Sequence, residues 1–164
     1  MTTSGGSDPG PSAEALAALH AVFLPVRGRR MAVVLGIAQA VVLVWVAAAM
    51  SSTGPEAAHW WDRAGVLLVS VGIGAMLWRF ARLAALPDDG GLTVRNLSGE
   101  RHLDWAEIVS VRFGGGQPWV TLDLADADSL AVMAIQRADG PRAEQEARRL
   151  ATLVALHSRT ERDD

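Results

Sequence analysis

The sequence predicts an α+β protein in which a two-helix transmembrane hairpin precedes a small antiparallel β-sheet or barrel, capped by a C-terminal α-helix. Three observations predict it. Two long apolar runs precede residue 86, short alternating apolar and polar segments follow residue 87, and an amphipathic helical pattern closes the chain. The expected organisation is a disordered tail at 1–26, a transmembrane hairpin at 27–86 and a β-domain at 87–164.

Composition supports a chain divided between an apolar part and a polar part. Half of the 164 residues are hydrophobic, the mean hydropathy is +0.20, and 20% of the residues are charged. There is no cysteine, which excludes disulfides, thiolate metal sites and a cysteine nucleophile. Residues 1–86 carry a net charge of +2 and residues 87–164 a net charge of −5. Because the C-terminal half is acidic, we expect no nucleic-acid partner, and we expect this half to be a poor general partner for anionic headgroups.

The N-terminal segment is small and polar. Residues 1–14, MTTSGGSDPGPSAE, have the composition of a disordered tail. Residues 15–26 predict at most a short amphipathic turn that ends near Pro25.

Two apolar runs predict membrane-spanning helices at about 31–50 and 64–82. Met31 to Met50 is twenty residues without a charge, about 30 Å of helix, which matches the hydrocarbon core. The second run, Ala64 to Trp78, is about 22 Å long, and tryptophans and arginines that suit membrane interfaces flank it. Two alternatives are a signal peptide cleaved after the first run and a buried soluble helix for the second.

The arginines predict the orientation. Five of them precede the first span or follow the second: Arg27, Arg29, Arg30, Arg79 and Arg82. The connecting loop, residues 51–63, has one arginine and two acids. By the positive-inside bias we expect a multi-pass protein of the inner membrane with both termini in the cytoplasm, in contact with the lipid bilayer.

Small residues within the spans leave two interpretations open. Five of them, Gly36, Ala40, Gly65, Gly72 and Gly74, offer surfaces through which the helices could pair with a second copy as a homo-oligomer. Alternatively, glycine and alanine are simply common in this chain. Gln39 either donates a hydrogen bond to a partner helix or is a tolerated lone amide.

Five short strands with turn residues between them predict an antiparallel meander. The alternating residues are Leu92, Val94 and Asn96; Arg101, Leu103 and Trp105; Val109, Val111 and Phe113; Val120, Leu122 and Leu124; and the run from Leu130 to Ile135. The segment LPDDGG, residues 86–91, reads as the linker that precedes the first strand.

One stretch, HLDWAEIVSVRF at 102–113, interrupts this alternation. Asp104 followed by Glu107 resembles a capping box and predicts a single helical turn at Trp105–Ile108. The turn would direct Trp105 and Ile108 into one core. A buried tryptophan removes about 200 Å² from water, so we expect a structural role for Trp105, and the alternative is contact with a ligand.

The last segment predicts a helix. Pro141 suits its first turn, with acids early and arginines late. Its apolar stripe, Ala143, Ala147, Leu150 and Val154, should cover one face or end of the sheet. The expected core is Trp105, Ile108, Phe113, Trp119 and Leu150. A curled antiparallel sheet capped by such a helix is the plan of a pleckstrin-homology (PH) domain.

Several motifs resemble those of a known family. LTVRNLSGERHLDWAEIVSVRF, the later Trp119, and LAVMAIQRADGPRAEQEARRL are similar to the actinobacterial PH-like domain of the low-molecular-weight protein antigen six type, over residues 83–157. The resemblance implies a PH-like fold, a membrane anchor and no catalytic residues. Eukaryotic PH domains that bind phosphoinositides carry basic residues on the first hairpin, where this chain has Arg95 and Arg101 but also Glu100.

No pattern indicates catalysis, a metal or a cofactor. The four histidines lie in different segments, and the acids at 123–128 lack the glycine and glutamate of a calcium loop. GGGQP does not open a helix and has no lysine, so it reads as a hairpin loop rather than a phosphate loop. The expected interaction surface consists of Arg112 and Gln117 near that loop and of Arg95 and Arg101 on the first hairpin.

These observations favour a non-enzymatic membrane protein that presents a cytoplasmic PH-like domain to a protein partner or scaffold. The partner itself is unknown from the sequence. Two alternatives remain: a domain that senses lipid headgroups, and an auxiliary subunit of a membrane enzyme or transporter.

Overall fold

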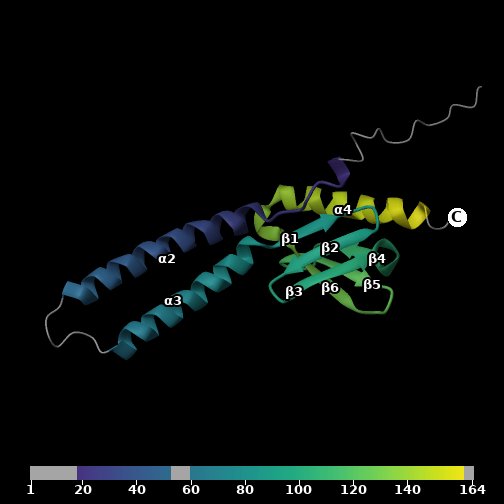
Figure 1. Cartoon of the computed structure of the whole chain (residues 1–164). Coiled ribbons are helices and arrows are strands. Elements are labelled where there is room, and N and C mark those ends of the chain that lie inside the picture. Colours follow the sequence, from purple (N-terminus) through teal and green to yellow (C-terminus); the bar gives the residue numbers. More distant parts are fainter. Residues whose placement is uncertain (1–17, 53–59, 161–164) are drawn as a thin grey trace, which may run out of the picture.

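The computed structural model describes residues 18–52 and 60–160, and the part of the predicted tail at 1–17 lies outside them. Two long helices, α2 at Val26–Ser52 and α3 at Trp60–Ala81, lie side by side and project from a small β-domain (Figure 1). A third helix, α4 at Pro141–Thr160, packs on that domain. The predicted α+β class, with a helix pair and a helix-capped antiparallel domain, is confirmed.

Between their charged ends, the two long helices carry apolar residues on all sides. No residue of α3 is buried, and both helices are long and apolar enough to cross a membrane. The Gln39 amide donates to the Ser70 hydroxyl on α3 at 3.2 Å, so the amide pairs within the hairpin. The first helix begins at Val26 rather than near residue 31, because its first turn is capped by the β-domain as described below.

The β-domain contains two three-stranded antiparallel sheets. The first has the order β1-β2-β3 and the second the order β4-β5-β6. The bounds are β1 Ala84–Pro87, β2 Gly91–Asn96, β3 Gly99–Asp104, β4 Ile108–Arg112, β5 Trp119–Leu124 and β6 Ser129–Gln136. Single 3-10 turns, η1 at Trp105–Glu107 and η2 at Arg137–Asp139, follow β3 and β6.

The domain begins earlier than the sequence indicated. The segment at 86–91, predicted as a linker, contains the end of β1 and the tight turn into β2. Before the helix pair, Phe23 pairs with Ala85 of β1 through two backbone hydrogen bonds of 2.9 and 3.1 Å, and its side chain is only 1% exposed. Residues around Phe23, predicted to belong to the disordered tail, therefore extend the first sheet, and the hairpin is inserted between two neighbouring parts of it.

The stretch at 102–113 folds largely as expected. The Glu107 carboxylate accepts a hydrogen bond from the Asp104 N–H at 2.9 Å, which fixes the η1 turn. Trp105 is 3% exposed, its indole N–H donates to the Asp88 carbonyl at 3.0 Å, and its ring stacks on His157 of α4 at 4.5 Å. The turn therefore joins the two sheets while anchoring α4.

The core lies between the sheets and α4. Trp105, Ile108 and Leu150 are buried, as is Leu153, which the predicted stripe did not include. Phe113 and Trp119, also predicted as core, are only partly buried. Trp119 precedes the buried Val120 on β5, and successive side chains of a strand point to opposite faces, so Trp119 does not enter the core with Val120.

The start of α2 is fixed to the β-domain. The Asp139 carboxylate accepts hydrogen bonds from the N–H groups of Val26 at 3.2 Å and Arg27 at 2.9 Å. The Arg27 guanidinium donates to the Ala138 carbonyl at 2.6 Å. A carboxylate on the first free amides of a helix is a favourable cap. A residue more than a hundred positions later in the chain therefore supplies the cap of the first long helix.

Candidate functional site

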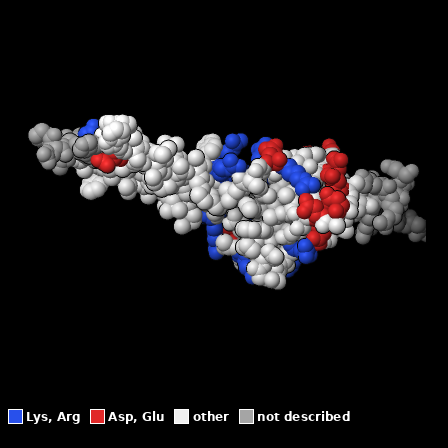
Figure 2. All heavy atoms as spheres, turned by 90° about the horizontal axis from the view of Figure 1, so that it is seen from below, with Lys and Arg blue, Asp and Glu red and all other residues white. Residues whose placement is uncertain are grey.

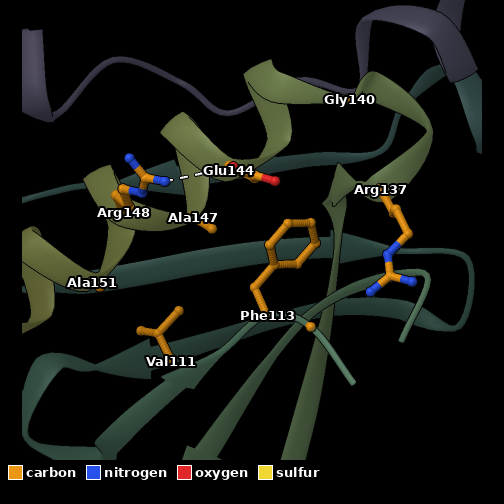
Figure 3. Close-up of a pocket in the computed structure, with 9 residues that line it drawn as sticks. Val111, Phe113, Arg137, Gly140, Glu144, Ala147, Arg148 and Ala151 are labelled. Carbon is orange, nitrogen blue, oxygen red and sulfur yellow. Dashed lines mark ion pairs between the residues drawn. The ribbon is translucent and has the colours of Figure 1, made fainter. Parts of the chain in front are cut away.

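A groove of about 590 Å³ runs between β4 and α4. Val111 and Phe113 supply its sheet side, and Ala147 supplies part of its helix side. Figure 3 shows the Phe113 ring between α4 and the side chain of Arg137. The helix contributes Glu144, Ala147, Arg148 and Ala151, whose spacing of three, one and three places them on one face.

The sheet side of the groove is an edge strand. Among the strands of residues 18–52 and 60–160, β4 pairs only with β5, and no other described strand lies along its second edge. A register shift between Ile108 and Ser110 turns Val109 outward, where it is 65% exposed. The alternation expected from the sequence groups Val109 with Val111 and Phe113, and it does not account for this irregularity.

The charges at the groove are unequally paired. Arg148 lies 3.5 Å from Glu144, an exposed pair that contributes little to stability. Within residues 18–52 and 60–160, the Arg137 guanidinium makes no ion pair with a carboxylate. The groove therefore offers an apolar floor with an available cation at one end.

The glycine loop forms a second hollow next to this groove. A volume of about 520 Å³ is lined partly by Arg112 and Gln117, and it shares Val111, Phe113 and Gly114 with the groove. The loop glycines 114, 115 and 116 have φ values of 139°, 59° and 90°, which residues with a side chain rarely adopt. The structure therefore brings the predicted residues Arg112 and Gln117 to the end of the groove.

Arg112 is held by its neighbours on the sheet. Its guanidinium lies 2.5 Å from the Asp123 carboxylate, which also accepts a hydrogen bond from the Ser110 hydroxyl at 2.6 Å. Because its guanidinium pairs with Asp123 on β5, Arg112 lines the hollow but does not offer an unpaired positive charge.

The other two predicted surface residues lie on the first sheet. Arg95 pairs with Glu100 at 2.6 Å, and Arg101 pairs with Asp128 at 3.2 Å. The Ser129 N–H and then Arg101 hold the pKa of the Asp128 carboxyl below its usual value. Neither Arg95 nor Arg101 is among the residues that line the hollow with Arg112 and Gln117.

The helix residues of the groove were missed by sequence reasoning. Glu144 and Arg148 follow the general charge pattern of a solvated helix face, so nothing in that pattern marks them as groove residues. Arg137 follows a strand directly, which was the available signal, but only the fold shows that it faces Phe113.

Two of the histidines do come together. The His20 and His157 rings lie 5.7 Å apart, edge to face. In the described part of the chain no group of three or more metal-ligating side chains is assembled. These histidines belong to the packing around Trp105 and α4.

Comparison with known proteins finds similarity over the β-domain. The family model of the bacterial PH domain matches residues 80–152. Proteins of Mycobacterium bovis and Mycobacterium tuberculosis, described only as uncharacterized, are each 47% identical over 64 residues, which is 39% of this chain and 42% of each relative. The chain thus matches about two fifths of the length of these relatives. No solved structure matches the chain significantly. The predicted likeness to an actinobacterial PH-like domain is confirmed.

Proposed function

We propose that this chain, whose residues 80–152 match the bacterial PH domain and follow two membrane-competent helices, is a non-enzymatic membrane protein that binds an extended segment of a protein partner. The hairpin crosses the inner membrane twice, and the domain lies on the cytoplasmic side. Arg27, Arg29 and Arg30 begin α2, while Arg79 ends α3 and Arg82 follows it, so all five lie at the domain end of the helices. This distribution is the one that the positive-inside bias assigns to cytoplasmic ends.

The groove between β4 and α4 is the observation that carries the binding function. An extended peptide can add a strand to an exposed sheet edge, because its backbone then satisfies the unpaired edge groups. Beside β4 such a segment would lie on Val111, Phe113 and Ala147. Its apolar side chains gain burial there, and an acidic side chain pairs with Arg137.

Site-specific photocrosslinking in native membranes tests this function. A photoreactive residue at Arg148 lies on the groove, and one at Ser98 lies on the exposed β2–β3 turn as a control. We expect a protein adduct from position 148 and none of the same mass from position 98. The adduct should fall severalfold with Val111→Arg, which places a long cation on the groove floor.

The same experiment separates the competing outcomes. Adducts of equal yield from both positions would indicate contact without a defined site. The absence of any protein adduct from position 148, in membranes where the chain is folded, would contradict a protein-binding groove.

A further inference from the structure

A separate hollow lies where α3 meets the β2–β3 hairpin. Its volume is about 340 Å³. The end of α3 and the residue after it contribute Trp78, Arg79 and Arg82, and the hairpin contributes Arg95 and Glu100. Sequence reasoning weighed Arg95 together with Arg101 on the hairpin alone. The fold instead joins Arg95 to two arginines that lie at least thirteen positions earlier.

The hollow carries a surplus of positive charge. Glu100 neutralises Arg95 at 2.6 Å. Arg79 donates to the Leu97 carbonyl, and the Arg82 guanidinium lies 5.9 Å from the centre of the Trp78 ring. Across residues 18–52 and 60–160, neither Arg79 nor Arg82 forms an ion pair with a carboxylate. Two guanidinium groups therefore remain for an anion.

The charges of the whole molecule are arranged along its length. Figure 2 shows arginines gathered where the helices meet the domain, and acidic side chains mostly toward the opposite end of the domain. The helix shaft between its tip and the domain is almost free of charge in this view. An anion approaching from the membrane side therefore meets the basic end first.

The level of the hollow within the bilayer follows from the proposed function, on which this inference rests. If α3 crosses the bilayer, its last turn reaches the headgroup region. Trp78 is 65% exposed beside the hollow, and tryptophan side chains favour that level of the bilayer. The hollow then opens among lipid phosphates rather than into the cytosol.

We infer that this hollow binds the phosphate of an anionic phospholipid with one phosphodiester, of the phosphatidylglycerol class. Arg79 and Arg82 supply charged donors that match phosphate oxygens. Glu100 in the same hollow disfavours a headgroup with several phosphates, because its carboxylate would repel the additional charge. Lipid binding here would hold the first sheet against the membrane surface.

Lipid retention by the full chain tests the site. The protein is reconstituted in nanodiscs of phosphatidylcholine with a minor fraction of phosphatidylglycerol, released into mild detergent, and analysed by native mass spectrometry. We expect the wild type to retain phosphatidylglycerol preferentially and R79Q/R82Q to lose at least roughly tenfold of this preference, since one charge-assisted hydrogen bond to the phosphate contributes about a factor of ten. The matched control R29Q/R30Q removes the same charge from α2, outside the hollow, and should keep the preference.

Further arms make each outcome decisive. The site would be overturned if both double variants lost the preference for phosphatidylglycerol equally. It would also be overturned if neither variant lost that preference. R79K/R82K keeps the positive charge and should keep most of the preference for phosphatidylglycerol. Loss of the preference in this variant would also count against the inference. Complete displacement of lipid by soluble glycerol phosphate would show a site for free phosphate and would overturn the lipid assignment. Protease protection of α2 and α3 in the same nanodiscs distinguishes a failed anchor from a failed lipid site.

Discussion

At the residue scale, Gly91 shows how closely the first sheet is packed. A Cβ atom at this position would lie 2.1 Å from the Leu103 carbonyl oxygen, and that backbone atom is fixed by strand pairing. We expect Gly91→Ala to destabilise the domain by about 1–3 kcal/mol, as overpacking does. Thermal unfolding of the full chain in detergent measures the change.

The neighbouring glycine is the control for that prediction. A Cβ at Gly90 would lie 3.5 Å from an Asp88 carboxylate oxygen, an ordinary contact, and Gly90 is exposed. Gly90→Ala should therefore leave the unfolding temperature nearly unchanged. If the two variants unfold at the same temperature, the strand register at Gly91 is wrong.

Asp128 gives a pH-dependent prediction at the same scale. Its pKa is lowered in the folded state by the Ser129 N–H and then by Arg101, so the ionised carboxylate favours folding. That contribution is present above the ordinary pKa of the carboxyl group and is lost as the pH falls through the lowered, folded-state pKa. We expect Asp128→Asn to lower the unfolding temperature near neutral pH and to have no effect in strong acid. A difference that grows toward acid would contradict this sign.

Single residues also show where sequence reasoning succeeded. Asp104 and Glu107 are adjacent to an apolar run, so a local capping rule placed the η1 turn and the burial of Trp105 follows from it. The groove could not be placed in that way. Arg137 follows β6 and Phe113 follows β4, and the two residues line the same groove only because the fold brings these strands and α4 together. Local sequence patterns carry no information on such long-range contacts.

At the element scale, β1 and the Phe23 pair explain the predicted boundary error. The four residues of β1, Ala84–Pro87, include two alanines and begin three residues after a long apolar helix ends, so no polar and apolar alternation separates them from it. Phe23 lies some sixty residues before its partner Ala85 and forms a single pair. The other strands were easier to predict, because their apolar and polar residues alternate and turn residues lie between most of them.

The Asp139 cap at the start of α2 can be tested at the scale of this helix. Asp139→Ala leaves the N–H groups of Val26 and Arg27 without their carboxylate partner, at a cost of about 0.5–2 kcal/mol. Hydrogen exchange in the first turn of α2 should become faster, while exchange in β2 and β5 should not change. The control Asp89→Ala changes an exposed turn residue. Unchanged exchange in α2 would show that the helix start does not depend on the domain.

The two attachments have a consequence for the position of the domain. α2 starts three residues after the Phe23 pair, and β1 starts three residues after α3 ends. With both connections this short, and with the Asp139 cap between them, the domain has little freedom to move away from the helix ends. It should therefore remain close to the membrane surface.

At the scale of the whole molecule, the division into an apolar shaft and a charged domain was predictable from composition and charge. Residue hydrophobicity alone locates the helices, and arginine counts alone suggest their orientation. The insertion of the shaft into the first sheet was not predictable, because it depends on a pairing across the entire hairpin.

The most direct test of the account is the sidedness of the hairpin. Because the chain has no cysteine, Asp62→Cys at the start of α3 and Ser98→Cys in the β-domain each create a single thiol. A maleimide that cannot cross membranes is applied to sealed spheroplasts and to inside-out vesicles. We predict labelling of position 62 only in spheroplasts and of position 98 only in inside-out vesicles. Labelling of both positions from the same side would contradict a membrane-spanning hairpin that carries a cytoplasmic domain.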